Sequence, residues 1–120
     1  MSYSVRSAAE ADAARVDADW GSLTWLASEA IGNADGMTVG RVIIRKGQSN
    51  PRHFHGNCQE VLYLLAGRLE HTMGERKTIL EPGDTLVVAA DCPHNAVSIG
   101  EVDADMIVIY DSGERDFRKE

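Results

Sequence analysis

A chain of 120 residues with 43% hydrophobic and 26% charged residues has the size and composition of one globular domain with its own core. Its net charge of −7 argues against a nucleic-acid partner, because phosphate backbones are bound by clustered Lys and Arg. No stretch approaches the roughly 20 apolar residues of a membrane span, and no signal peptide is visible. We therefore predict a cytoplasmic protein with no membrane partner, in which Cys58 and Cys92 are free thiols.

Short strand patterns separated by turn residues follow one another along the chain. Residues 1–20 are rich in Ala and Asp and predict a weakly structured arm, with a short helix as the less favoured alternative. Strands are expected at 22–27, 37–46, 60–67, 68–73, 85–90, 97–100 and 105–111, with turns at 31–36, 47–51, 56–59, 74–77 and 91–96. Strands at this spacing predict an all-β sandwich or barrel over residues 21–112, followed by a polar tail at 113–120.

One stretch carries metal-binding residue types at a strand spacing. His53 and His55 lie two residues apart, so in an extended chain their side chains point to the same side. The turn at 56–59 lets the chain reverse, so that Glu60 can enter the same cavity from the next strand. A further candidate ligand is His94, which lies far downstream. Three imidazoles and a carboxylate suit one divalent Fe, Mn, Co, Ni, Cu or Zn ion with positions left open for a substrate.

The stretch from Gly47 to Gly67 resembles the first motif of the cupin family, G-x5-H-x-H-x3–4-E-x6-G, at every fixed position. The second cupin motif, G-x5-P-x-G-x2-H-x3-N, is matched only in part. Gly83 and His94 are in place, whereas Ala89, Asp91 and Ser98 replace the proline, the glycine and the asparagine.

The resemblance implies a small single-domain cupin, which is an all-β jelly roll or double-stranded β-helix. It implies a metal held by His53, His55, Glu60 and His94, and a homodimer. Because the family is functionally broad, fold membership does not fix the activity. Our leading hypothesis is a metal-dependent enzyme that acts on a small oxygen-rich molecule, either as a dioxygenase or as a non-redox isomerase, lyase or cyclase. The alternative is a non-catalytic module that binds a sugar or a carboxylate.

The sequence says less about catalytic groups than about metal ligands. His71 and Glu60 are the two candidates for an acid or base, although a surface position on its strand is the favoured interpretation of His71. Because Glu60 should point inward, Leu62 and Leu64 should do so too, and Tyr63 should face the other way.

Overall fold

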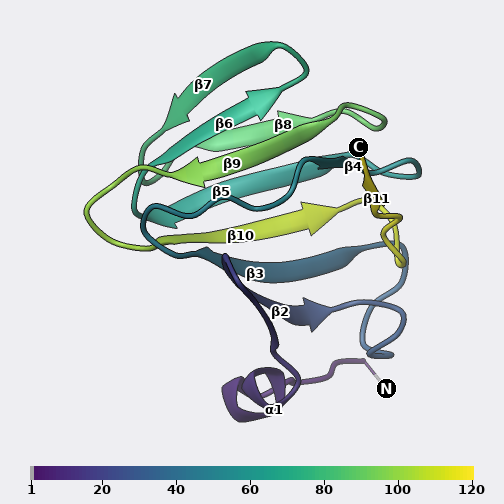
Figure 1. The fold of residues 1–120 in the computed structure, drawn as a ribbon. Helices are drawn as coiled ribbons and strands as arrows, with labels where there is room; N and C mark the ends of the chain where they lie inside the picture. Colours follow the sequence, from purple (N-terminus) through teal and green to yellow (C-terminus); the bar gives the residue numbers. More distant parts are fainter. Residues whose placement is uncertain (1) are drawn as a thin grey trace.

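The computed structural model describes residues 2–120, which form two antiparallel sheets packed on each other (Figure 1). The six-stranded sheet contains, in spatial order, β1 (Val16–Ala18), β2 (Gly21–Ala27), β3 (Thr38–Ile44), β10 (Ala104–Tyr110), β5 (Glu60–Ala66) and β8 (Thr85–Val88). The five-stranded sheet contains β11 (Arg118–Lys119), β4 (His53–Phe54), β9 (His94–Ser98), β6 (Leu69–Met73) and β7 (Arg76–Leu80). From β3 onward the chain crosses repeatedly between the sheets, as in a jelly roll. The predicted all-β class is confirmed.

Alternation of side chains along the central strands places the core between the sheets. In β5, Leu62 and Leu64 are buried, whereas Tyr63 and Leu65 are exposed on the outer face. Strands β3 and β10 show the same period of two, which is typical of a sheet with one packed face. The predicted inward direction of Leu62 and Leu64 is therefore confirmed, as is the outward direction of Tyr63.

Residues 2–20 contain regular structure. Helix α1 (Ala8–Ala13) begins with a capping box, in which the Ser7 hydroxyl accepts from the Glu10 backbone N–H and the Glu10 carboxylate accepts from the Ser7 N–H. Ala11 is buried, and β1 then pairs with β2 at the edge of the larger sheet. The short helix, which the sequence made the less favoured choice, is thus the one that forms.

Two turns are shorter than the sequence pattern indicates. The turn expected at 74–77 narrows because β7 already begins at Arg76, after Gly74 with a φ of 58°. The turn expected at 91–96 ends early because β9 begins at His94.

Gly67 has a φ of 86°, and a Cβ there would lie 2.7 Å from the Cα of Ala104, so only glycine fits this position.

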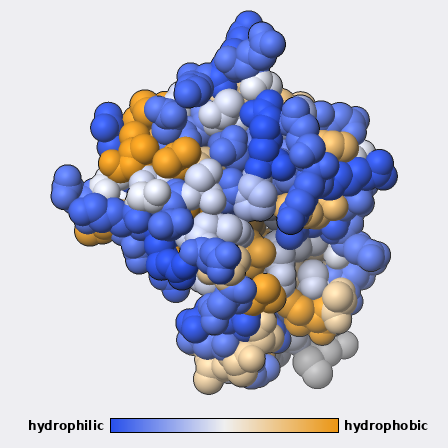
Figure 2. All heavy atoms as spheres, viewed as in Figure 1, coloured by the Kyte–Doolittle hydropathy of each residue, from blue (hydrophilic) through white to orange (hydrophobic). Residues whose placement is uncertain are grey.

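The surface seen in Figure 2 is largely hydrophilic, with hydrophobic side chains gathered in a few small areas. Of the residues described, none belongs to a helix long and apolar enough to cross a bilayer.

Candidate metal centre

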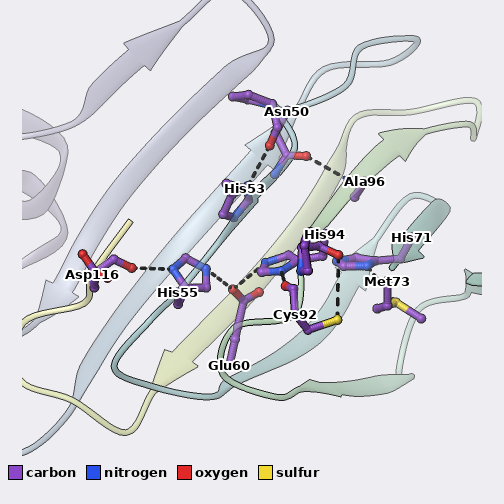
Figure 3. A network of polar contacts seen from close by, with 12 residues as sticks. Asn50, His53, His55, Glu60, His71, Met73, Cys92, His94, Ala96 and Asp116 are labelled. Carbon is purple, nitrogen blue, oxygen red and sulfur yellow. Dashed lines mark hydrogen bonds and ion pairs between the residues drawn. The ribbon is translucent and has the colours of Figure 1, made fainter. Parts of the chain in front are cut away.

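Four buried side chains from both sheets converge on one point (Figure 3). His53 lies in β4, His55 directly follows that strand, and His94 begins β9 in the same sheet. Glu60 begins β5 in the opposite sheet. One ligand atom from each of the four lies within 4.8 Å of those of the other three. The structure therefore brings together the four residues that the sequence singled out.

Each of the three imidazoles is held through Nδ1 by a backbone carbonyl. The acceptors are Pro51 O at 2.7 Å from His53, Asp116 O at 2.8 Å from His55, and Cys92 O at 2.9 Å from His94. A carbonyl accepts only, so each Nδ1 carries a proton and Nε2 is the nitrogen left to face a metal. This arrangement fixes the tautomer and the ring orientation that a metal ligand needs.

The Nε2 atoms and the Glu60 carboxylate form an incomplete hydrogen-bond set. His55 Nε2 lies 3.1 Å from Glu60 Oε1. His94 Nε2 lies 3.4 Å from the same oxygen without hydrogen-bond geometry, and it is a buried polar atom with no partner. Buried polar atoms are normally satisfied, so an unpartnered Nε2 that faces two imidazoles and a carboxylate fits a metal ion.

Protonation in the cluster also suits a cation. Burial raises the pKa of Glu60, but contacts with His55 and His94 outweigh burial and hold its pKa well below the usual range. Burial lowers the pKa of His53 to about 4, so this imidazole is neutral at pH 7. Burial also lowers the pKa of His94, but Glu60 more than offsets this and the net pKa is raised. Because a metal needs the unprotonated Nε2, protons and a metal compete for His94.

The cluster opens onto a cavity of about 180 Å³ between the sheets. Most of its wall is apolar and comes from core residues such as Leu62 and Met106. Its polar wall groups outside the cluster include His71, Tyr110 and Arg115. Burial raises the pKa of Tyr110 well above its usual value, so the hydroxyl remains protonated.

His71 is buried in the cavity wall, so the expectation of a surface position is wrong. Its ring stacks on that of His94 with centroids 5.7 Å apart, and its Nδ1 lies 3.1 Å from the sulfur of Met73 (Figure 3). Burial lowers the pKa of His71 to about 4. Leu69, two residues earlier, is fully buried on the same face of β6.

The C-terminal residues 111–120 supply a part of the site that sequence reasoning missed. Phe117 stacks on His53 with ring centroids 4.6 Å apart, and the Asp116 carbonyl holds His55. Strand β11 then pairs with β4, placing Lys119 opposite His53. In Figure 1 this segment runs beside β4 to the C-terminus. The polar composition of these residues gives no local signal for this contact.

In the turn before His94, Asp91 stands where the second motif has its glycine. Asp91 has a φ of 65° and is the only non-glycine residue with positive φ among residues 2–120. Its backbone N–H donates to the carbonyl of His55 at 2.8 Å. Aspartate tolerates the left-handed conformation better than most residues, so it can replace the glycine of the motif here.

Comparison with known proteins agrees with this geometry. A family model described as "Cupin domain" matches residues 40–110, which is more than half of the chain. The chain belongs to the cupin family. Germin-like protein 3-8 of Oryza sativa subsp. japonica is 33% identical to this cupin over 85 residues, which cover 67% of this chain and 38% of the relative. A putative germin-like protein 3-4 of the same organism is 30% identical over 88 residues. The matched segment therefore covers well under half the length of these two relatives.

Solved structures with the same fold extend over most of this cupin. KdgF from Halomonas sp. superposes with a TM-score of 0.77 at 24% identity, covering 94% of this chain and 96% of KdgF. Oxalate decarboxylase from Lactobacillus farciminis, as a formate complex, gives a TM-score of 0.82 at 16% identity, covering 88% of this chain and 32% of the decarboxylase. Oxalate oxidase in complex with glycolate gives a TM-score of 0.76 at 20% identity, covering 84% of this chain and 55% of the oxidase. At these identities the likeness establishes the double-stranded β-helix.

Proposed function

We propose that this cupin is a metal-dependent enzyme that acts on a small, oxygen-rich organic molecule. The observation that carries the proposal is the convergence of His53, His55, Glu60 and His94 at the wall of a cavity between the sheets. A closed structural metal site has no need of adjoining space, whereas a catalytic site keeps room for a substrate beside the ligands.

The size of the cavity limits the substrate. A volume of about 180 Å³ is smaller than the roughly 300–1,000 Å³ of pockets that hold drug-sized ligands. Oxalate and glycolate, which appear in the names of the structural neighbours, are small molecules with several oxygen donors. We therefore expect a substrate of few non-hydrogen atoms that offers two oxygen donors.

A divalent transition metal in this cluster would supply Lewis acidity toward such a chelating oxygen donor and, if redox-active, a place for oxygen to react. The chain's own groups would orient the substrate and manage protons. Tyr110 offers a protonated hydroxyl in the cavity wall. The apolar walls exclude bulk water, which strengthens electrostatic contacts within the cavity.

Of the two candidate acid or base groups, His71 fits the role better than Glu60. Glu60 already contacts His55 and His94 and belongs to the ligand set. His71 is outside that set, lines the cavity and, with a pKa of about 4, is neutral at pH 7. A neutral imidazole can accept a proton from a substrate and can return that proton in a later step.

Elemental analysis of protein purified without added metal tests the proposal most directly. We expect close to one equivalent of a transition metal, or its uptake on reconstitution, and we expect His53→Ala to lose it. Less than about a tenth of an equivalent after reconstitution would defeat the metalloenzyme assignment. Oxygen consumption during turnover would then separate a dioxygenase from an isomerase, lyase or cyclase. A protein that binds metal and ligand but turns nothing over would be a binding module.

We also propose a homodimer that forms through the outer face of the six-stranded sheet. Four apolar side chains from adjacent strands lie in one cross-strand row on this face: Val39, Ile109, Val61 and Val87. Tyr63 and Leu65 extend the exposed apolar area. An apolar area of this kind on a soluble protein is typical of an interface.

Sedimentation velocity tests the dimer. The double substitution Tyr63→Glu and Ile109→Glu should give monomers, because it places charge in the middle of the apolar face. Ile79→Glu is the matched control, since Ile79 is an exposed apolar residue of the other sheet. A monomeric wild type would exclude the dimer, and a dimeric double variant would exclude this interface.

Both cysteines are free, which supports the predicted cytoplasmic location.

A further inference from the structure

Arg115 places a positive charge in the cavity wall beside the metal cluster. Its guanidinium carbon lies 4.8 Å from the ring centroid of Trp25, 4.9 Å from that of Phe117 and 5.5 Å from that of Tyr110. The residue is partly buried and lines the same cavity as His53 and Glu60. Cation–π contacts hold the side chain in place and use none of its five N–H donors.

Within residues 2–120, no carboxylate pairs with Arg115. Its neighbours differ in this respect, since Arg118 pairs with Asp116 at 2.8 Å and Arg52 pairs with Glu120. No N–H of the Arg115 side chain donates to a described protein acceptor either. A partly buried guanidinium without an acceptor in the protein leaves its donors free for an acceptor that enters the cavity.

The charges around the cavity favour an anion as that acceptor. Among residues 2–120, Glu60 supplies the only carboxylate in the cavity wall. A divalent cation in the cluster already outweighs this single negative charge. Arg115 adds a further positive charge, so the loaded site has an excess of positive charge in an apolar cavity, where charge interactions are strong.

We propose that Arg115 binds a carboxylate group of the substrate and selects dicarboxylates, or carboxylates of similar charge, over neutral molecules of the same shape. This inference rests on the proposed function, because the other end of the substrate is taken to meet the metal cluster. The two anchors line the same cavity and share Tyr110 as a neighbour, whose ring centroid lies 5.5 Å from the Arg115 guanidinium carbon and 4.9 Å from the ring centroid of His55. A dicarboxylate whose two carboxylates are joined by a short carbon chain can therefore contact both. The planar guanidinium suits a carboxylate because it can donate two parallel hydrogen bonds.

Isothermal titration calorimetry with matched charged and neutral probes tests the assignment. The probes are oxalate, malonate and succinate, each compared with its neutral diamide, on metal-reconstituted and on metal-free protein. We expect at least one dicarboxylate to bind the wild type more tightly than its diamide. Arg115→Gln should weaken the binding of that dicarboxylate roughly 10- to 100-fold and leave the diamide within about twofold. Arg115→Lys should fall between, because it keeps the charge but loses the paired donors.

Arg118→Gln is the matched control, since Arg118 lies on the same segment and is mostly exposed. It should bind every probe as the wild type does. The far-ultraviolet circular dichroism and the metal content of Arg115→Gln should equal those of the wild type, because Arg115 is no ligand.

Two results would overturn the assignment of Arg115. One is a wild type that binds none of the three dicarboxylates. The other is an Arg115→Gln variant whose affinities for dicarboxylate and diamide fall equally or do not fall at all. Either result would show that Arg115 only packs against its neighbours and does not bind the carboxylate. A failure of the proposed function gives a different result, because the wild type then holds no metal. The dicarboxylate affinities of metal-free wild type and metal-free Arg115→Gln can still be compared in that case, so the assignment of Arg115 is tested separately.

Discussion

The ligand set depends on backbone atoms as much as on side chains. Each imidazole of the cluster donates from Nδ1 to a carbonyl, and the three carbonyls come from two turns and the C-terminal segment. Such contacts fix the ring and raise the basicity of the opposite nitrogen. The chain therefore needs correct turn geometry at these positions.

The two histidines that stack on each other should differ sharply when substituted. His94→Gln removes an Nε2 that faces Glu60, whereas His71→Gln removes a ring that lies outside the ligand set. We expect the first change to lower metal affinity by at least 100-fold and the second by less than about tenfold, since only the first removes a direct ligand. Competition with a chelator measures both. Equal losses in the two variants would show that the ligand assignment is wrong.

The left-handed residue before His94 gives a second prediction at this scale. Asp91→Val should lower the free energy of unfolding by roughly 1–2 kcal/mol, because a β-branched residue is strained at positive φ. Asp91→Gly should be neutral or slightly stabilising, since glycine has no such strain. Urea denaturation of the metal-free variants measures both. If valine were tolerated as well as glycine, the turn would not have this conformation in solution.

At the scale of elements, alternation along the chain made most of the fold predictable. In strands β3, β5 and β10, buried side chains alternate with partly or fully exposed ones over almost the whole strand, and the sequence shows the same period. The ligands were predictable because His53, His55 and Glu60 lie close together in the chain at a spacing that two strands can satisfy.

What the sequence could not predict depends on contacts between distant segments. His71 is buried because β6 pairs with β9, which places it opposite Ala96 on the inner face. The contact of His55 with Asp116 joins residues 61 positions apart. No local pattern encodes which face of a polar tail meets the barrel, so Arg115 and Phe117 were missed as well.

The C-terminal segment should be needed to hold the metal but not to form the barrel. Removing residues 115–120 deletes the carbonyl that holds His55, the ring that stacks on His53, and strand β11. The main core cluster does not include these residues, so the circular dichroism spectrum should remain that of a β-protein. We expect metal affinity to fall about 10- to 100-fold, as for the loss of other groups that orient ligands.

Chelator competition measures this loss, with Arg118→Gln as the full-length control that keeps the backbone contacts. Unchanged metal affinity after truncation would show that the segment does not support the ligands.

For the molecule as a whole, the cluster joins the two sheets. Glu60 belongs to the six-stranded sheet, whereas His53 and His94 belong to the five-stranded sheet. A bound cation would therefore link the layers and stabilise the folded state over the unfolded chain, in which no site exists. Without the cation, buried imidazoles determine how stability depends on pH.

Metal-free protein should lose stability as the pH falls from about 6.5 to about 4. Burial lowers the pKa of both His53 and His71 from 6.5 to about 4. In this interval the unfolded chain binds more protons than the folded protein, so the free energy of unfolding decreases as pH decreases. Glu60, whose pKa is lowered, adds to the loss toward the acid end. The pKa of His94 is raised in the folded protein, so above pH 6.5 this group has the opposite effect: it increases the free energy of unfolding as the pH falls.

Thermal unfolding of metal-free protein across this range measures the slope. His71→Gln removes one of the two buried imidazoles, so the melting temperature should depend less steeply on pH between pH 4 and 6.5. Asn95→Gln is the control: it changes a partly exposed neighbour of His94 and should leave the pH dependence of the melting temperature unaltered. A melting temperature that stays constant or rises as the pH falls through this window would mean that neither imidazole is buried in its neutral form.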